Sequence, residues 1–417
     1  MIGIYRDANL RSNKIHIDEL LLMISILLGC RSVFVQANPY FGYILLSITS
    51  ILSIIAVTIR KGAKLNSKSI LVFFGYLFIA MVVTLTVTNT SNGPFIFSYW
   101  VLVPLMLFFF LLLTYQEKMD WLKHFSDVIF IFTVLSTISW LIGPIMNLIQ
   151  PTHTIDLFWG KLTRYDGYFF CYVRPEIKLK SFLGIALPDN NSIYVEAPIT
   201  NVIFSLGYIL NSFVKKDKSK VKEAVFIISL FSTMSTSAML IAVVIFSIGR
   251  ILAYKENPSK GSLHFFITRL VLPIVFLIFA CFAISFILDM KRDTDYGNYY
   301  AHTFALKSGF DAWLTKPFSG YGYELGQQFY NTTSGFFKVL VHGGIIFAFL
   351  YIVPFVASVR FAIKEKDFGL LMFLGSSFVL LILVIWHYSP AYMFILAFEY
   401  SFMGKDNSIK TQEIEHN

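Results

Sequence analysis

Arginine side chains suited to binding phosphate occur in two polar stretches of the chain, residues 150–196 and 289–336. Arg164 and Arg174 lie in the first stretch and Arg292 in the second. A guanidinium group is a planar fork that binds phosphate through two parallel hydrogen bonds, and a preorganised cation stabilises charge developing on a leaving group. We expect Arg174 and Arg292 to stabilise a leaving phosphate and Arg164 to contact it, although solvated loop arginines would give the same pattern.

Glu196 and His302 are the candidates for proton transfer. Glu196 lies two residues before Pro198, and proline is well tolerated in the first turn of a helix. The carboxylate therefore either acts as a base or orienter for an attacking hydroxyl, or complements the positive end of a helix dipole. His302 can serve as a base near neutral pH, but an isolated loop histidine is also commonly solvated or structural.

Further lysine and tyrosine side chains in these stretches fit a ligand that carries both phosphate and sugar. Lys178 and Lys180 lie in the first stretch, and Tyr321 and Tyr323 in the second. Lysines attract either a phosphate ligand or anionic lipid headgroups. Tyrosines either anchor a protein at the bilayer interface or offer a flat face to a sugar ring. We expect these four side chains to contact the substrate.

A metal site is not expected. Asp293 and Asp295 form a D-x-D pattern, and two carboxylates at this spacing can share a hard cation. The pattern is nevertheless common by chance, and the eight histidines show no metal-ligating spacing. We therefore expect neither a metal nor another cofactor.

The elements around these polar stretches are predicted to be membrane helices. Of the 417 residues, 56% are hydrophobic and 14% are charged, whereas a soluble domain is about half apolar and a quarter charged. Because a spanning helix needs about 20 apolar residues, the pattern predicts an all-α polytopic membrane protein, a single integral membrane domain over residues 1–417 with about twelve spans. The expected spans are roughly 17–35, 40–59, 70–88, 95–115, 127–149, 197–214, 223–236, 237–254, 268–288, 337–358, 368–387 and 389–403.

Basic residues between the spans set the expected orientation. Three short loops hold them: Arg60, Lys61, Lys64 and Lys68; Lys215, Lys216, Lys218, Lys220 and Lys222; Arg360, Lys364 and Lys366. With an even number of spans and no cleavable signal peptide, these loops and both termini share one side, which the positive-inside rule assigns to the cytoplasm. The two large loops, 150–196 and 289–336, then face outward. The net charge of +9 reflects this topology rather than nucleic-acid binding.

The segment KPFSGYGYELGQQF, residues 316–329, is predicted to form a tight turn just outside the bilayer. Gly320 and Gly322 permit positive φ and close backbone approach, and Pro317 restricts φ nearby. Irregular backbone near a membrane is tolerated where it is buried in protein or lines a wet cavity. We expect the segment to form part of a cavity rim, although a purely structural turn would have the same residues.

Four stretches, in their order along the chain, resemble segments of the bacterial O-antigen polymerases (Wzy-type), within the superfamily of O-antigen polymerases and ligases. VEAPITNVIFSLGYIL (195–210) is similar to the glutamate-and-proline entry into a helix after the first large loop, and STSAMLIAVVIFSIG (235–249) to a Ser/Thr-rich helix start. KPFSGYGYELG (316–326) resembles the P-then-G-x-G segment, and FFKVLVHGGIIFAFLYI (336–352) a helix opening with glycine before an Ile-Ile pair. Thr333 and Ser334 replace the His-Asn pair usual in the ligase branch, which favours a polymerase.

The resemblance implies a GT-C-like helical fold in the bacterial cytoplasmic (inner) membrane and a glycosyltransferase acting in O-antigen or capsular polysaccharide synthesis. In the implied reaction, a sugar hydroxyl of one lipid-linked repeat unit attacks the anomeric carbon of a glycan on undecaprenyl pyrophosphate, and the lipid pyrophosphate leaves. No nucleotide or metal takes part. The implied partners are the undecaprenyl-pyrophosphate-linked oligosaccharide, membrane lipids and a separate chain-length regulator protein.

Other functions remain open at this stage. A flippase for lipid-linked oligosaccharides would also have about twelve spans, but it would carry charges within its spans and short loops on both sides. An O-antigen ligase shares the chemistry and differs in its acceptor. A purely structural membrane scaffold is a further alternative. The concentration of charges in two outward loops favours a transferase.

Overall fold

The computed structural model describes residues 15–62, 65–87, 93–159, 161–175, 180–182, 185–215, 219–235, 247, 296–323, 325–326 and 334–404. The chain is mostly helical. Among these residues, six helices are long and apolar enough to cross a membrane: Pro39–Lys61, Ser67–Val87, Gly93–Leu112, Tyr115–Ile145, Ala197–Val214 and Gly335–Lys364. This agrees with the predicted polytopic membrane protein. Apart from residue 247, the predicted spans 237–254 and 268–288 lie outside the described residues, so the count of twelve stays a prediction.

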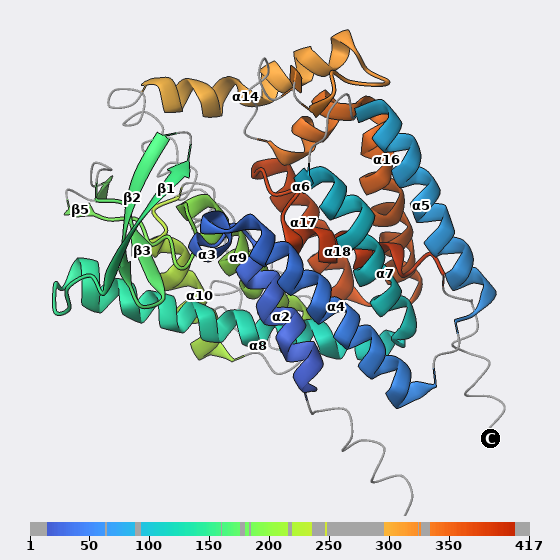
Figure 1. Ribbon diagram of the computed structural model, residues 1–417, viewed down its shortest axis with the longest axis horizontal. Helices are drawn as coiled ribbons and strands as arrows, with labels where there is room; N and C mark the ends of the chain where they lie inside the picture. Colours follow the sequence, from blue (N-terminus) through green and yellow to red (C-terminus); the bar gives the residue numbers. More distant parts are fainter. Residues whose placement is uncertain are drawn as a thin grey trace, which may run out of the picture.

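The helices pack into a bundle (Figure 1). In chain order they are α2 (Ile17–Gly29), α3 (Val33–Ala37), α4 (Pro39–Lys61), α5 (Ser67–Val87), α6 (Gly93–Ile96), α7 (Val103–Leu112), α8 (Tyr115–Trp140), α9 (Ala197–Ile209), α10 (Lys220–Ser232), α14 (Tyr296–Thr315), α16 (Gly335–Lys364), α17 (Phe368–Leu383) and α18 (Pro390–Tyr400). Three π-helical segments continue the spans: η2 (Phe97–Leu102), η3 (Leu141–Ile145) and η4 (Leu210–Val214). π-helical turns inside α-helices are often found at functional sites.

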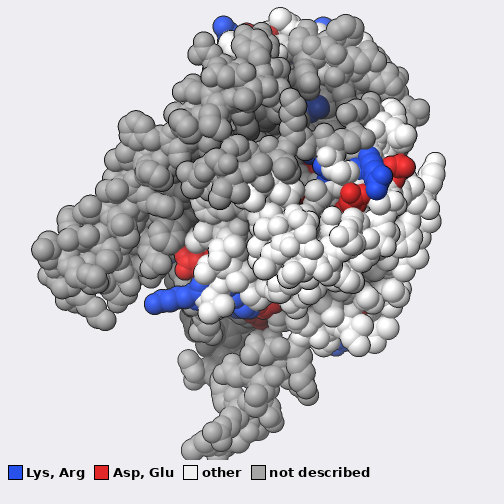
Figure 2. All heavy atoms as spheres, turned by 90° about the vertical axis from the view of Figure 1, so that its left-hand side faces the viewer, with Lys and Arg blue, Asp and Glu red and all other residues white. Residues whose placement is uncertain are grey.

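Apolar side chains cover the outward faces of the peripheral helices. Ile44, Ile48 and Ile55 on α4 are exposed, as are Phe74 and Phe78 on α5. On the face drawn in Figure 2, most of the described atoms belong to neither basic nor acidic residues. Water would penalise so much exposed apolar surface, whereas lipid tails do not, and the outer helix faces therefore fit a bilayer.

The first large loop contains β-strands, which corrects the all-α prediction. β1 (His153–Trp159), β2 (Lys161–Tyr168) and β3 (Cys171–Val173) form an antiparallel sheet in that order, and β4 (Lys180–Phe182) pairs with β5 (Ile185–Leu187). In β2, Thr163 and Tyr165 point inward while Leu162 and Arg164 are exposed, an alternation typical of a half-buried strand. The stretch was predicted as a polar loop, and its alternation of inward and outward side chains was not recognised.

A buried asparagine fixes the segment that returns from the sheet to the helices. The Ser136 hydroxyl donates to Asn190 Oδ1 at 2.9 Å, and Asn190 Nδ2 donates to the Ser232 hydroxyl at 2.9 Å. The same Oδ1 accepts from the Ser192 amide at 2.9 Å and from the Cys171 thiol at 3.5 Å. Asn190 thus ties α8, α10 and β3 together, and it is fully buried.

The second large loop also has regular structure. Residues 296–315, predicted as loop, form the 20-residue helix α14. Figure 1 shows α14 lying across the end of the bundle rather than running along it. Ala312 faces inward, whereas Phe310 and Leu314 are exposed on the outward side. A helix with this mixed composition lies at a membrane interface more readily than it spans one.

Helix α16 is broken in its N-terminal third at two glycines. Gly343 has φ −137° and ψ 15°, and Gly344 has φ 60° and ψ −155°. The second conformation belongs to a region open essentially to glycine alone. The break leaves carbonyl groups at the end of one half-helix and amide groups at the start of the next without helical partners.

The backbone of residues 316–322, here called the glycine loop, fills both halves of this break. The Tyr321 and Gly322 amides donate to the Val341 and His342 carbonyls, each at 2.8 Å. In the other direction, the Ile345 amide donates to the Pro317 carbonyl at 2.8 Å. The loop therefore replaces lost helical hydrogen bonds on both sides of the break.

The predicted tight turn in the glycine loop is confirmed. Gly320 and Gly322 have φ of 62° and 80°. A Cβ on Gly320 would lie 2.6 Å from the Val341 carbonyl oxygen, so the close approach to α16 requires glycine. Across the interface, a Cβ on Gly344 would lie 2.3 Å from the Phe318 carbonyl group.

We predict that Gly344→Ala destabilises the protein by about 3 kcal/mol or more, because alanine adds both backbone strain and overlap with Phe318. Thermal unfolding in detergent measures the change. Gly375→Ala is the matched control, since a Cβ on this α17 glycine meets nothing within 4 Å. Equal unfolding temperatures for the two variants would contradict the glycine-loop interlock.

Candidate functional site

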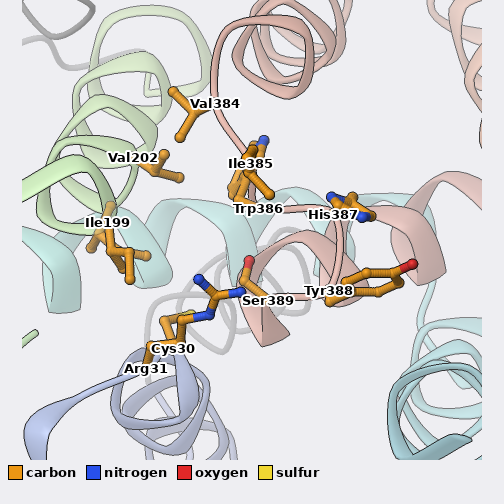
Figure 3. Close-up of a pocket in the computed structure, with 11 residues that line it drawn as sticks. Cys30, Arg31, Ile199, Val202, Val384, Ile385, Trp386, His387, Tyr388 and Ser389 are labelled. Carbon is orange, nitrogen blue, oxygen red and sulfur yellow. The ribbon is translucent and has the colours of Figure 1, made fainter. Parts of the chain in front are cut away.

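A pocket lies where three segments far apart in the sequence meet (Figure 3). They are the junction between α2 and α3, the first turns of α9, and the connection between α17 and α18. The lining residues are Cys30, Arg31, Ile199, Val202, Ile203, Val384, Ile385, Trp386, His387, Tyr388 and Ser389. Figure 3 shows the guanidinium of Arg31 extending from its helix junction toward Ser389. The pocket is therefore an apolar recess with a cation in it.

The backbone holds Arg31 in an uncommon conformation. Its φ is 57°, in the left-handed region that costs a non-glycine residue about 1–2 kcal/mol. The residue persists there because its neighbours pair with the segment after Asn190: the Val33 amide donates to the Ile193 carbonyl at 2.9 Å, and the Val195 amide donates to the Arg31 carbonyl at 3.3 Å. Such outliers concentrate at functional sites.

The same pairing places Glu196 beside Arg31. Their nearest side-chain atoms, Arg31 Nη1 and Glu196 Oε1, are 4.0 Å apart, with 42% and 25% of the side chains exposed. Glu196 is the N-cap residue of α9, but its carboxylate makes no capping hydrogen bond. A partly exposed pair of this length contributes less than about 1 kcal/mol to stability, so its effect is mainly on the direction of the Arg31 side chain.

Arg174 follows β3 and lies in the same region. Its Nε is buried and has no hydrogen-bond partner within the described part of the chain. Burial raises the pKa of the Tyr165 hydroxyl, and the charges of Arg174 and Glu196 act on that hydroxyl in opposite directions. Tyr165 donates to the Val195 carbonyl at 3.0 Å, next to Glu196. The structure thus brings two predicted residues, Arg174 and Glu196, to one tyrosine.

A further cation, Lys338, comes from the first turn of α16. It is half-buried, and it forms no salt bridge within the described ranges. Arg31 is near enough to act electrostatically on Lys338, and both cations act on His387. Two neighbouring positive charges favour an anionic ligand, because their mutual repulsion falls when an anion lies between them.

Behind the pocket, two histidines and two tyrosines form a buried cluster. His342 Nδ1 lies 2.8 Å from the Tyr388 hydroxyl, and the two rings stack at 10°. The ring of Tyr323 packs against both, with centroids 5.0 and 5.6 Å away. His387 and Tyr388 rings are 3.9 Å apart. Tyr323, a predicted substrate contact, therefore joins the glycine-loop region to the pocket wall instead of lying free on the surface.

The other predicted residues lie elsewhere. Arg164 on β2 is exposed and bonds Asp166 at 3.1 Å, so it is a solvated ion pair away from the pocket. Tyr321 bonds the Thr315 hydroxyl, and Lys316 Nζ lies 4.6 Å from the centre of its ring. The glycine loop does not line this pocket, and its expected place on a cavity rim stays a prediction.

Several predicted residues cannot be placed in the site. Arg292 and Lys178 lie outside the described residues, as do Asp293 and Asp295. His302 lies in α14 and Lys180 in β4, and their side chains lie outside the described part. Among the described residues, no group of three or more His, Cys, Asp or Glu side chains could hold a metal ion.

Sequence reasoning assigned no binding role to Arg31 and His387, which line the pocket, or to Lys338, which lies near Arg31. The available signal was an ionisable residue within an apolar segment, which is a functional candidate by default. Lys338 and His387 both satisfy that rule.

No family model matches the sequence, and no curated protein matches it.

We predict that Arg31→Gln weakens binding of inorganic pyrophosphate about 10- to 100-fold, because a hydrogen bond to a charged group contributes about 1.5–3 kcal/mol. Isothermal titration calorimetry on the detergent-solubilised protein measures the affinity. Arg164→Gln is the control, since Arg164 is exposed and paired outside the pocket. Equal losses in the two variants would show that pyrophosphate binds by general surface charge.

Proposed function

We propose that the protein is a polymerase of lipid-linked oligosaccharide repeat units. A sugar hydroxyl of one repeat unit attacks the anomeric carbon of a glycan carried on undecaprenyl pyrophosphate. The new glycosidic bond forms as the bond to pyrophosphate breaks, and the electron pair leaves on the pyrophosphate oxygen. The support from sequence is the resemblance of four ordered stretches to O-antigen polymerases.

The observation that carries the proposal is the placement of Arg31. It is a cation held in strained backbone, in an apolar recess at one end of a membrane bundle, with Lys338 close by. A lipid pyrophosphate combines an apolar tail with a dianionic headgroup, which matches this combination. Fixed cations in a dry site stabilise a leaving pyrophosphate without reorganisation during the reaction.

The remaining polar residues have roles consistent with this reaction. Glu196, 4.0 Å from Arg31, orients the guanidinium rather than capping α9. Arg174, whose buried Nε has no hydrogen-bond partner among the residues that the structure describes, offers a donor to a phosphate or to the glycan. Arg292 remains a candidate contact to the leaving group by the resemblance alone.

The orientation of the bundle is part of the proposal. At the end opposite the pocket, Arg60 pairs with Asp18 and Glu19, and both Lys215 and Lys222 pair with Asp127. The positive-inside rule favours this end for the cytoplasm. The pocket, the sheet and α14 then face the outer side of the bacterial inner membrane, where lipid-linked repeat units are polymerised in the resembled family.

We predict that purified protein in detergent converts a synthetic undecaprenyl-pyrophosphate-linked repeat unit into a ladder of longer products, without nucleotide or added metal. Arg31→Gln lowers the rate about 100- to 1,000-fold, the usual effect of removing one transition-state donor. Gel electrophoresis of the products measures the rate, and Arg164→Gln keeps the wild-type rate.

A flippase would give a different result. The wild type would make no ladder from the correct repeat unit, yet it would move that lipid across a liposome membrane. Transfer of the glycan to a lipid A acceptor, with no ladder on undecaprenyl pyrophosphate, would instead indicate a ligase.

A further inference from the structure

His387 is a buried titratable group whose ring packs against Tyr388 and His342. It is fully buried, and neither Nδ1 nor Nε2 has a hydrogen-bond partner within the described part of the chain. Leaving a buried polar atom unpaired costs about 1–3 kcal/mol. Native proteins keep few such groups, and each calls for an explanation such as a missing ligand or a catalytic role.

The position of His387 is fixed by its backbone. The hydroxyls of Tyr351 and Tyr99 donate to the His387 carbonyl at 3.2 and 3.4 Å. Pro390 begins α18 two residues after Tyr388, which keeps the connection from α17 irregular at this point. The residue is thus anchored by its carbonyl, while its imidazole belongs to the wall of the pocket that contains Arg31.

The groups around His387 favour its neutral imidazole, which is the form that can accept a proton. The groups that act on it are Arg31 at the α2–α3 junction, Lys338 and His342 on α16, and the adjacent Tyr388. No carboxylate acts on His387 among the described residues. Two fixed cations oppose a positive charge on the imidazole, and a bound pyrophosphate would offset their effect as the reaction proceeds.

We propose that His387 is the catalytic base that accepts the proton of the attacking sugar hydroxyl. The inference rests on the proposed polymerase function and names the residue that activates its acceptor. Its support is geometric: Arg31, the cation for the leaving group, and His387 line the same pocket, and the ring nitrogens of His387 have no hydrogen-bond partner among the described residues.

The step is balanced as follows. The hydroxyl oxygen of the acceptor sugar forms a bond to the anomeric carbon of the donor, and its proton moves to a ring nitrogen of His387. The bond from that carbon to the pyrophosphate oxygen breaks, and its electron pair stays on the pyrophosphate beside Arg31. His387 then releases the proton to solvent, which restores the neutral imidazole for the next addition.

The test measures polymerisation and ligand binding on the same full-length variants. His387→Gln should lower the rate of ladder formation at least about 100-fold, the usual contribution of a general base. It should change the affinity for inorganic pyrophosphate less than about twofold, since Arg31 and Lys338 remain. His387→Ala should lose the ladder and regain part of it on addition of free imidazole. His153→Gln is the control, because His153 is exposed at the start of β1, outside the pocket, and bonds the Tyr172 hydroxyl at 2.7 Å.

The outcomes separate this inference from the function on which it rests. A wild-type ladder with unchanged rates in His387→Gln overturns the role of His387 and leaves the polymerase. A wild type that binds pyrophosphate and makes no ladder overturns both. Loss of pyrophosphate binding together with the ladder, with no rescue by imidazole in His387→Ala, assigns His387 to pocket structure and also overturns its role as base.

Discussion

The exchange of backbone hydrogen bonds between the glycine loop and the break in α16 is the constraint on which the pocket end of the molecule depends. A broken helix exposes amides and carbonyls that are costly to bury unpaired. Residues 317–322 pair with groups on both sides of the break. The half-helix before the break, which carries Lys338 and His342, therefore has a fixed direction that differs from an unbroken α16. Tyr323, directly after the loop, packs on His342 and on the pocket residue Tyr388. It therefore links the position of the glycine loop to that of the pocket wall.

The proposed site draws its residues from parts of the chain that only the fold brings together. Arg31 comes from a helix junction, Arg174 from the end of a strand, and Lys338 from a half-helix. Backbone pairing positions Arg31 and Arg174, and the kink in α16 sets the direction of the half-helix that carries Lys338. Such an arrangement keeps cations near one another at the edge of an apolar bundle, where an ordinary packed core would separate them.

The sequence predicted the elements that depend on local composition. Long apolar runs predicted spanning helices, and Gly320 and Gly322 predicted a turn with positive φ. The proximity of Glu196 to a helix start was also predictable, because Pro198 marks such a start. What could not be predicted depends on tertiary contacts. The pairing of residues 193–195 with the α2–α3 junction brings Arg31 into the pocket, and no local pattern encodes it. The strands after Thr152 were not predicted because the alternation of apolar and polar residues in them is short. Their charged residues were interpreted instead as ligand contacts in a loop.

The burial of the described cysteines has a practical consequence for redox behaviour. Cys30 and Cys171 are both free and buried, and burial raises the pKa of the Cys171 thiol to about 12. Since thiolates rather than thiols react, neither cysteine is primed for oxidation or alkylation in the folded protein. An oxidising compartment would therefore leave these two thiols reduced, and a single cysteine introduced on an exposed strand or helix would be labelled in preference to both.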